Sequence, residues 1–245
     1  YVNGVYTGLY LGSDRVDDEF IRQMGLSGDG DLYKAVTHDA NYGLTDAEGE
    51  PKASLTQGFE KKEGDPEDWS SLTALVAFTG SAEVSDLVSH GRHWIDVSEF
   101  IDWLLLATYA LTEDSAGKNA YLYSDGPGEQ MRFVPWDFNQ SWGQGWNTRR
   151  KDVERLPDYS DVNRIFEMIQ AHPATVEELQ HRYRVLRSDG GPFDPAWLQW
   201  KLDTYYSLIA PSAARDWARW GDEYQSFERW DEIRDAHDDW NDYEG

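Results

Sequence analysis

Two short β-prone segments around a tight turn constrain the fold of this chain more than any other feature of its sequence. Residues 120–123 (Ala-Tyr-Leu-Tyr) and 131–135 (Met-Arg-Phe-Val-Pro) both favour strands, and Asp-Gly-Pro-Gly at 125–128 is a typical turn sequence. Two strands joined by a tight turn form an antiparallel hairpin, so the chain before the first strand meets the chain after the second. Asp114 and Asp137 flank this hairpin, and we predict that they are neighbours in space.

The helical pattern dominates the second half of the chain. From Asp96 to Leu111 the apolar residues recur at helical spacing, which predicts a central core helix. Asp96 can cap its first turn while Glu99 reaches back in an arrangement like a capping box. Four further helices are predicted, over residues 162–171, 174–188, 195–209 and 212–240, the last with an aromatic stripe.

The first eighty residues mix strands, loops and short helices. Asn3-Gly4 between β-prone residues predicts a two-residue hairpin turn, and the strand before it is so short that we expect the chain to begin inside a hairpin. The other expected elements are a capped helix over 16–25, a strand over 31–36, a long loop over 37–63 and a helix from Asp65-Pro66 to about Thr79.

These patterns predict an α+β fold with a small β-containing part, residues 1–80, followed by a mostly helical part, residues 81–245. A chain of 245 residues with 40% apolar content is large enough to bury a core, as one large domain or as two lobes that share a cleft.

Charge and composition exclude several classes of function. The 22 basic and 46 acidic residues give a net charge of −24, and such a surface repels nucleic acids and anionic lipid headgroups. The chain has no cysteine, which excludes disulfides, thiolate metal sites and a cysteine nucleophile. No apolar run approaches the roughly 18 to 20 residues that a membrane span requires, so we expect none.

The chemistry-bearing residues are arranged as phosphoryl transfer from ATP requires. That reaction uses a carboxylate to accept or orient the attacking hydroxyl, and oxygen ligands to hold magnesium on the phosphates. Asp114, four further residues and Asn119 precede the hairpin, and an Asp-Phe pair at Asp137 follows it. Lys34, in the strand predicted upstream, supplies the cation that the α- and β-phosphates need.

Each of these residues also has a structural interpretation that the sequence leaves open. Asp114 can cap a turn, Asn119 can satisfy turn backbone groups, and Lys34 can face solvent from its strand. His90 and His93 are three residues apart, but no third ligand accompanies them, which favours a solvated loop over a metal pair.

A family resemblance joins these motifs. The segment from Asp114-Ser115 through Lys118-Asn119-Ala120-Tyr121-Leu122-Tyr123, and then residues 133–143 (Phe-Val-Pro-Trp-Asp-Phe-Asn-Gln-Ser-Trp-Gly), resemble the signature of the spore-coat-protein-H (CotH) kinase family. Residues 2–11, residues 30–34 (Gly-Asp-Leu-Tyr-Lys), and Phe59-Glu60-Lys61-Lys62 with Trp69 are also similar to that family's pattern.

This resemblance implies an atypical protein-kinase-like fold with an N-lobe in residues 1–80, truncated at its start, and a helical C-lobe in residues 81–245. It implies a protein that binds ATP and Mg²⁺ and phosphorylates serine or threonine of a protein acceptor. Asp114 would be the catalytic aspartate, and Asn119 and Asp137 would be the magnesium ligands. Lys34 would contact the nucleotide phosphates, and Asp14 would orient it through an ion pair.

Other functions use the same features. One alternative is a kinase-fold protein without activity that binds protein partners at a spore surface or cell envelope. Another is a kinase-fold enzyme that transfers AMP or ligates glutamate, because these reactions reuse a magnesium-nucleotide site. The resemblance also implies a spore-coat, envelope or extracellular location. Asn139 stands where relatives commonly carry an acid.

Overall fold

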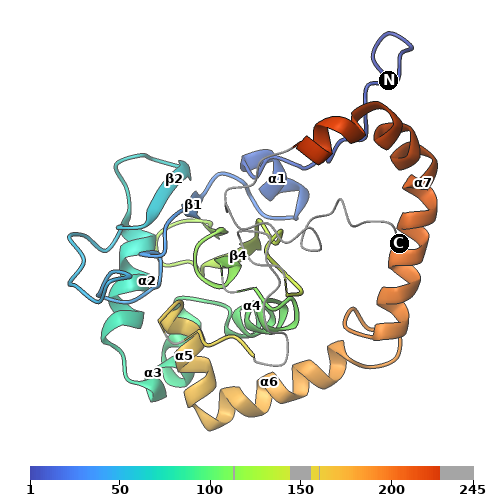
Figure 1. The fold of residues 1–245 in the computed structure, drawn as a ribbon. Coiled ribbons are helices and arrows are strands. Elements are labelled where there is room, and N and C mark those ends of the chain that lie inside the picture. The colour runs from blue at the N-terminus through green and yellow to red at the C-terminus, as the bar shows by residue number, and fades with distance from the viewer. Residues whose placement is uncertain (113, 144–155, 160, 227–245) are drawn as a thin grey trace. The chain divides into compact units, whose positions relative to one another are not determined.

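The computed structural model describes residues 1–112, 114–143, 156–159 and 161–226 (Figure 1). The chain forms two compact units. Of the described residues, one contains 1–13 and 184–226, and the other contains 14–112, 114–143, 156–159 and 161–183. The second unit carries all the predicted site residues.

A four-stranded antiparallel sheet is the centre of the second unit. Its strands are β1 (Asp31–Ala35), β2 (Phe59–Glu63), β3 (Ala120–Ser124) and β4 (Arg132–Pro135), in the order β2-β1-β3-β4. The predicted hairpin is therefore confirmed as β3 and β4, and the α+β class is confirmed. The sheet takes two strands from each side of the division expected between residues 80 and 81.

The strand β2 corrects one prediction, which placed residues 37–63 in a loop. The segment Phe-Glu-Lys-Lys-Glu has little intrinsic preference for a strand, but the open edge of β1 pairs with its backbone. Burial fixes it further, because Phe59 is buried and the Lys61 ammonium forms a buried ion pair with Asp31 at 2.6 Å.

The two faces of the sheet are covered by different helices. On one face, α1 (Asp18–Gln23) packs its buried Ile21 into a cluster with Leu32, Tyr123 and Val134. The helix α4 (Val97–Tyr109) lies on the other face (Figure 1). Its Trp103 stacks on Phe133 of β4, with ring centroids 4.1 Å apart. The helix predicted over 16–25 is confirmed, with Asp17 as its N-cap.

The remaining helices largely follow the sequence pattern. They are α2 (Ser70–Ser81), α3 (Val84–Ser89), α5 (Arg164–Ala171), α6 (Pro173–Leu186) and α7 (Pro195–Ser226), with short 3₁₀ turns at Gly91–His93 and Asp114–Ala116. The helix α3 is an exception, because it was not predicted. In the described part of the chain, no helix is long and apolar enough to span a membrane.

Two helix boundaries differ from the predictions. α2 begins at Ser70 rather than at Asp65, because the Asp65 and Asp68 side chains accept backbone N–H groups and close turns before the helix. α7 continues through Pro211, where two helices were predicted, because a long helix can tolerate the loss of one backbone hydrogen bond. The end of the predicted last helix, from residue 227, lies outside the described residues.

The start of α4 shows how the core helix is tied to the sheet. Asp96 caps the helix as predicted and accepts hydrogen bonds from the backbone N–H groups of Ser98 and Glu99. The Glu99 side chain does not reach back to the cap. It accepts a hydrogen bond from the Phe133 N–H at 2.7 Å and contacts Arg132 at 3.2 Å. Burial raises the pKa of Glu99, and these contacts partly oppose that rise.

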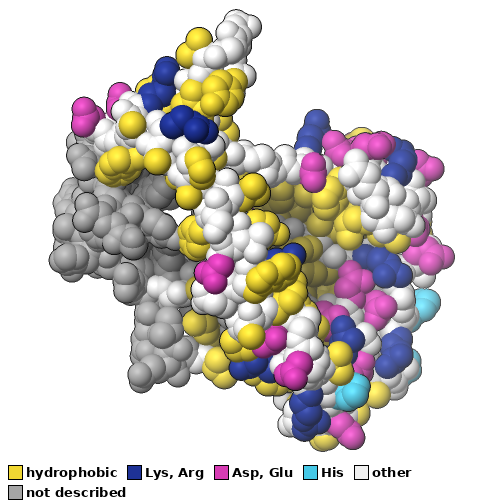
Figure 2. Space-filling view, turned by 90° about the vertical axis from the view of Figure 1, so that its right-hand side faces the viewer, with side chains coloured by type: hydrophobic (Ala, Val, Ile, Leu, Met, Phe, Trp, Pro, Cys, Tyr) yellow, Lys and Arg dark blue, Asp and Glu magenta, His cyan; other side chains and the backbone are white. Residues whose placement is uncertain are grey.

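The other compact unit joins the start of the chain to α7. The predicted Asn3-Gly4 turn is confirmed, with Val2 and Val5 paired by two backbone hydrogen bonds. Further along, the Tyr6 hydroxyl donates to the Ser212 carbonyl at 2.7 Å. α7 also exposes large apolar side chains: Trp200, Leu202, Tyr205, Tyr206, Leu208, Ile209 and Trp217. Figure 2 shows exposed hydrophobic side chains on one face of the molecule.

A buried lysine in the 37–58 segment leads to a testable prediction. The Lys52 ammonium is buried, and no described residue forms a hydrogen bond with it. Burial lowers its pKa from 10.5 to about 8, although the carboxylates of Asp39 and Asp46 oppose this. Below pH 8 the folded protein holds a buried charge. We therefore expect Lys52→Met to raise the free energy of unfolding by about 1–3 kcal/mol at pH 7.

The pH dependence distinguishes this effect from simple packing. Between pH 8 and 10.5 the unfolded chain binds more protons than the folded chain. The free energy of unfolding of the wild-type protein therefore rises relative to that of Lys52→Met as the pH increases. Urea titrations at pH 7 and pH 10 would measure this, with the exposed Lys62→Met as control. An advantage of Lys52→Met that stays constant with pH would contradict the explanation.

Candidate functional site

One end of the sheet gathers the predicted site residues. The strand register places Ala35 of β1 opposite Ala120 of β3, and Ala120 opposite Pro135 of β4. The segments beyond these three residues therefore leave the sheet at the same end, and they contain Asn119 and Asp137. Lys34 lies one residue further inside, opposite Tyr121.

The loop between α4 and β3 is fixed by hydrogen bonds from buried side chains. The Trp103 indole N–H donates to the Ser115 carbonyl at 2.9 Å, and the Asn163 amide donates to the Ala116 carbonyl at 2.7 Å. The Tyr159 hydroxyl donates to the Thr112 carbonyl at 3.0 Å. These donors are packed in the core, and they fix the backbone of the loop at Thr112, Ser115 and Ala116.

Gly117 is required by this close packing. A Cβ atom at residue 117 would lie 2.6 Å from the Val162 carbonyl oxygen, so backbone must move to admit it. We expect Gly117→Ala to lower the free energy of unfolding by about 1–3 kcal/mol, which chemical denaturation can measure. Gly43→Ala is the matched control, because its Cβ would meet no atom closer than 3.4 Å. Equal effects of the two substitutions would contradict this account of the loop.

The Asp114 carboxylate is the point on which the charged groups of the site converge. Its side chain is 18% exposed. The Asn119 amide donates to one carboxylate oxygen at 2.7 Å, and the Lys118 ammonium lies 3.0 Å from the other. His38 Nε2, from the segment that follows β1, lies 3.7 Å from that same oxygen. Asp114 is thus held from two sides and still reaches solvent.

Asp137 lies beside this loop, as predicted. Its backbone carbonyl accepts a hydrogen bond from the Ser115 hydroxyl at 2.5 Å, which joins the segments that carry the two aspartates. Asp137 is exposed. Asp137 and Asn119 have φ angles of 56° and 55°, a left-handed conformation that non-glycine residues seldom adopt and that is enriched at functional sites.

Lys34 and Asp14 are not brought together. The Lys34 ammonium lies 5.6 Å from the ring centroid of Tyr121 and 5.7 Å from that of Trp136. Asp14 is exposed, and no salt bridge joins it to Lys34 in the described structure. The expected ion pair is therefore not formed.

Sequence reasoning missed four side chains at this site: His38, Lys118, Tyr121 and Trp136. Lys118 had an available signal, because its position four residues after Asp114 is the spacing of a local ion pair. Trp136 had one as well, because it directly precedes Asp137. His38 and Tyr121 reach the site only through strand pairing and loop packing.

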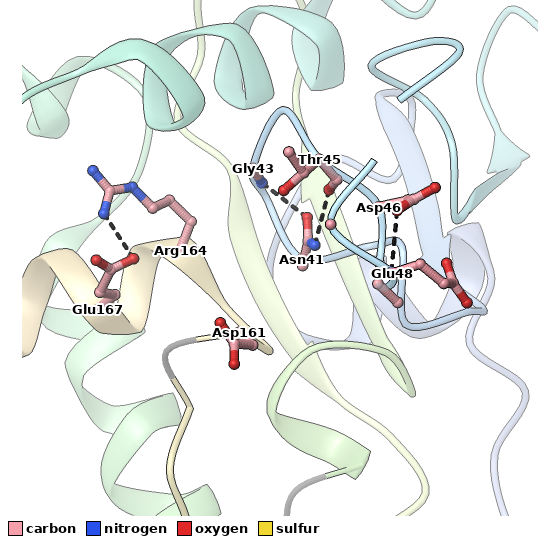
Figure 3. Close-up of a pocket in the computed structure, with 10 residues that line it drawn as sticks. Asn41, Gly43, Thr45, Asp46, Glu48, Asp161, Arg164 and Glu167 are labelled. Carbon is pink, nitrogen blue, oxygen red and sulfur yellow. Dashed lines mark hydrogen bonds and ion pairs between the residues drawn. The ribbon is translucent and has the colours of Figure 1, made fainter. Parts of the chain in front are cut away.

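One pocket in this unit is separate from these residues. It has a volume of about 460 Å³ and lies between the 41–49 loop and the start of α5 (Figure 3). Arg164, its cation, is already paired with Glu167 at 2.7 Å, and Asp46, Glu48 and Asp161 make the rest of the lining acidic. None of the predicted site residues lines it.

Comparison with known proteins identifies the family of this chain. The family model described as CotH kinase protein matches residues 1–240. The inner spore coat protein H of Bacillus subtilis (strain 168) is 27% identical over 218 residues, which cover 88% of this chain and 59% of the relative. The chain thus spans about three-fifths of the length of this curated relative. With the family model matched over almost its whole length, the chain belongs to the CotH kinase protein family.

Proposed function

We propose that this protein is an ATP- and Mg²⁺-dependent phosphotransferase with a kinase-like arrangement of two lobes, and that its acceptor is a serine or threonine hydroxyl of a protein. The observation that carries the proposal is the convergence of Asn119 and Lys118 on the Asp114 carboxylate, beside the segment of Asp137. A carboxylate next to oxygen ligands for a metal is the arrangement that phosphoryl transfer requires.

Asp114 is proposed as the group that accepts the proton of the acceptor hydroxyl. Its partial exposure leaves room for an incoming hydroxyl, and its contacts with Lys118 and Asn119 hold the carboxylate in one orientation. General-base catalysis depends on such positioning before it depends on pKa.

The donor set of the site fits magnesium. Because the Asn119 amide nitrogen is engaged by Asp114, its carbonyl oxygen is the group left for a cation. Asp137 adds an exposed carboxylate. No group of three or more His, Cys, Asp or Glu able to hold a metal occurs among the described residues. That is compatible with Mg²⁺, which typically binds one or two protein ligands together with substrate phosphates. When bound, Mg²⁺ would neutralise charge on the transferred phosphoryl group.

Lys34 is proposed as the cation for the nucleotide phosphates. In a chain with a net charge of −24, a free nucleotide meets repulsion, so a lysine near the Asp137 segment is needed on the enzyme side.

The relative's name, inner spore coat protein H, supports a spore-coat or envelope setting for this chain as well.

The test is transfer of radioactive phosphate from ATP in the presence of Mg²⁺, to the protein itself and to a library of peptides that contain serine or threonine. Label from the γ position is expected in the acceptor, as phosphoserine or phosphothreonine. Label from the α position would indicate AMP transfer instead. Incorporation from neither position would favour glutamate ligation, which labelled glutamate would detect, or a protein-binding module without catalytic activity.

A further inference from the structure

We propose that the rings of Tyr121 and Trp136 position Lys34 for the nucleotide phosphates, in the place where a carboxylate was expected. The inference rests on the proposed function, because it assigns the orientation of a lysine in that same site. Tyr121 and Trp136 are here called the aromatic seat, and both act as positioning residues rather than catalytic residues.

The strand register builds the seat from three segments that are far apart in sequence. Lys34 in β1 lies directly opposite Tyr121 in β3, so their side chains share one face of the sheet. Tyr121 lies opposite Val134 in β4, and Trp136 follows two residues later on the same face. The two rings meet edge to face, 5.7 Å apart at 89°, and the Lys34 ammonium lies within 6 Å of both.

The seat itself is anchored in a packed cluster. Tyr121 is 7% exposed and belongs to the apolar cluster under α1, and Trp136 packs against the same cluster. Lys34 is half-buried above them. Packing therefore holds the two rings in place, and they restrict the positions that the Lys34 ammonium can adopt.

The neighbouring carboxylate is occupied by another lysine. Glu60, opposite Lys34 on β2, forms its ion pair with Lys62. Lys34 makes no ion pair with any described residue. Lys61, on the other face of the sheet, differs from Lys34, because Asp31 neutralises its charge and its side chain is only 5% exposed.

This difference decides which lysine can serve a phosphate. A carboxylate partner cancels the charge of a lysine, and an anion must compete with that partner. An aromatic face attracts the ammonium by about 0.5–2 kcal/mol without cancelling its charge, so Lys34 remains a cation for an incoming anion. Trp136 also directly precedes Asp137, so one segment sets the position of both the phosphate lysine and the proposed metal ligand.

The experiment measures the affinity of Mg·ADP and of adenosine by isothermal titration calorimetry. We expect Lys34→Met and Trp136→Leu each to weaken Mg·ADP binding by about 5–20-fold and to leave adenosine binding unchanged, because adenosine carries no phosphate. Trp136→Phe should restore most of the affinity, since it keeps an aromatic face. In the Lys34→Met background, Trp136→Leu should have no further effect, because the two residues act through one interaction.

Controls separate the seat from general packing. Trp94→Leu removes an indole that packs against Phe78, near the turn end of the β3–β4 hairpin, and should leave Mg·ADP affinity unchanged. Trp136→Met provides a second aliphatic replacement if Trp136→Leu does not fold. If Lys34→Met lowers Mg·ADP affinity but neither Trp136→Leu nor Trp136→Met does, the inference is wrong and the proposed function stands. Failure of the wild-type protein to bind Mg·ADP would overturn the proposed function together with it.

Discussion

Replacing Asp114 by Asn is expected to lower the rate of phosphate transfer at saturating Mg·ATP by about 10²–10⁴-fold, the usual contribution of a general base. The amide has nearly the same shape as the carboxylate, but it cannot accept the proton of the acceptor hydroxyl. Mg·ATP affinity should change little, because the proposed metal ligands are Asn119 and Asp137. The measurement is the turnover number for self-phosphorylation or for the best peptide acceptor.

A surface aspartate provides the control for this substitution. Asp18, in α1, pairs with Arg22 at 2.7 Å, and Asp18→Asn should leave the turnover number unchanged. If Asp114→Asn lost Mg·ATP binding to the same degree as turnover, Asp114 would be a binding or structural residue. Unchanged turnover would remove Asp114 from the reaction altogether.

Replacing Asp137 by Ala is expected to abolish the stabilisation of the protein by Mg·ATP. A ligand that binds only the folded state raises the free energy of unfolding, by about 2.7 kcal/mol when its concentration is 100 times its Kd. Most of that gain should disappear in Asp137→Ala, because the exposed carboxylate is the charged group proposed to hold the metal on the phosphates. Thermal unfolding with ATP, with and without Mg²⁺, measures the effect.

The matched control lies two residues away in the same segment. Asn139 is also exposed, and Asn139→Ala should keep the Mg²⁺-dependent shift in melting temperature. A shift that survives in Asp137→Ala would place the metal elsewhere. The same shift lost equally in both variants would indicate a general change in the loop rather than the loss of one ligand.

Local sequence patterns were sufficient for much of the fold. The β3–β4 hairpin was predicted because strand-forming residues flank a turn sequence, and the Asn3-Gly4 turn because few other residue pairs favour that geometry. α4 was predicted because its apolar residues recur at helical spacing behind the cap at Asp96. In each case the residues that decide the structure lie within a few positions of one another.

Local patterns did not predict the strand β2 or the contacts of Glu99 with β4. Nothing local marks Phe59–Glu63 as a strand, since its pairing depends on the open edge of β1, about 25 residues earlier. Glu99 satisfies the rule for a capping box, yet the Phe133 N–H competes for the same carboxylate once α4 lies against β4.

The sequence by itself was enough to select candidate site residues and to predict that a hairpin brings the Asp114 and Asp137 segments together. Short-range turn and strand preferences are enough for that. Only the tertiary structure decided that Lys34 lies on Tyr121 and Trp136 rather than beside Asp14, and that Tyr159 and Asn163 hold the Asp114 loop. These contacts join residues distant in the chain, and strand register and core packing set them.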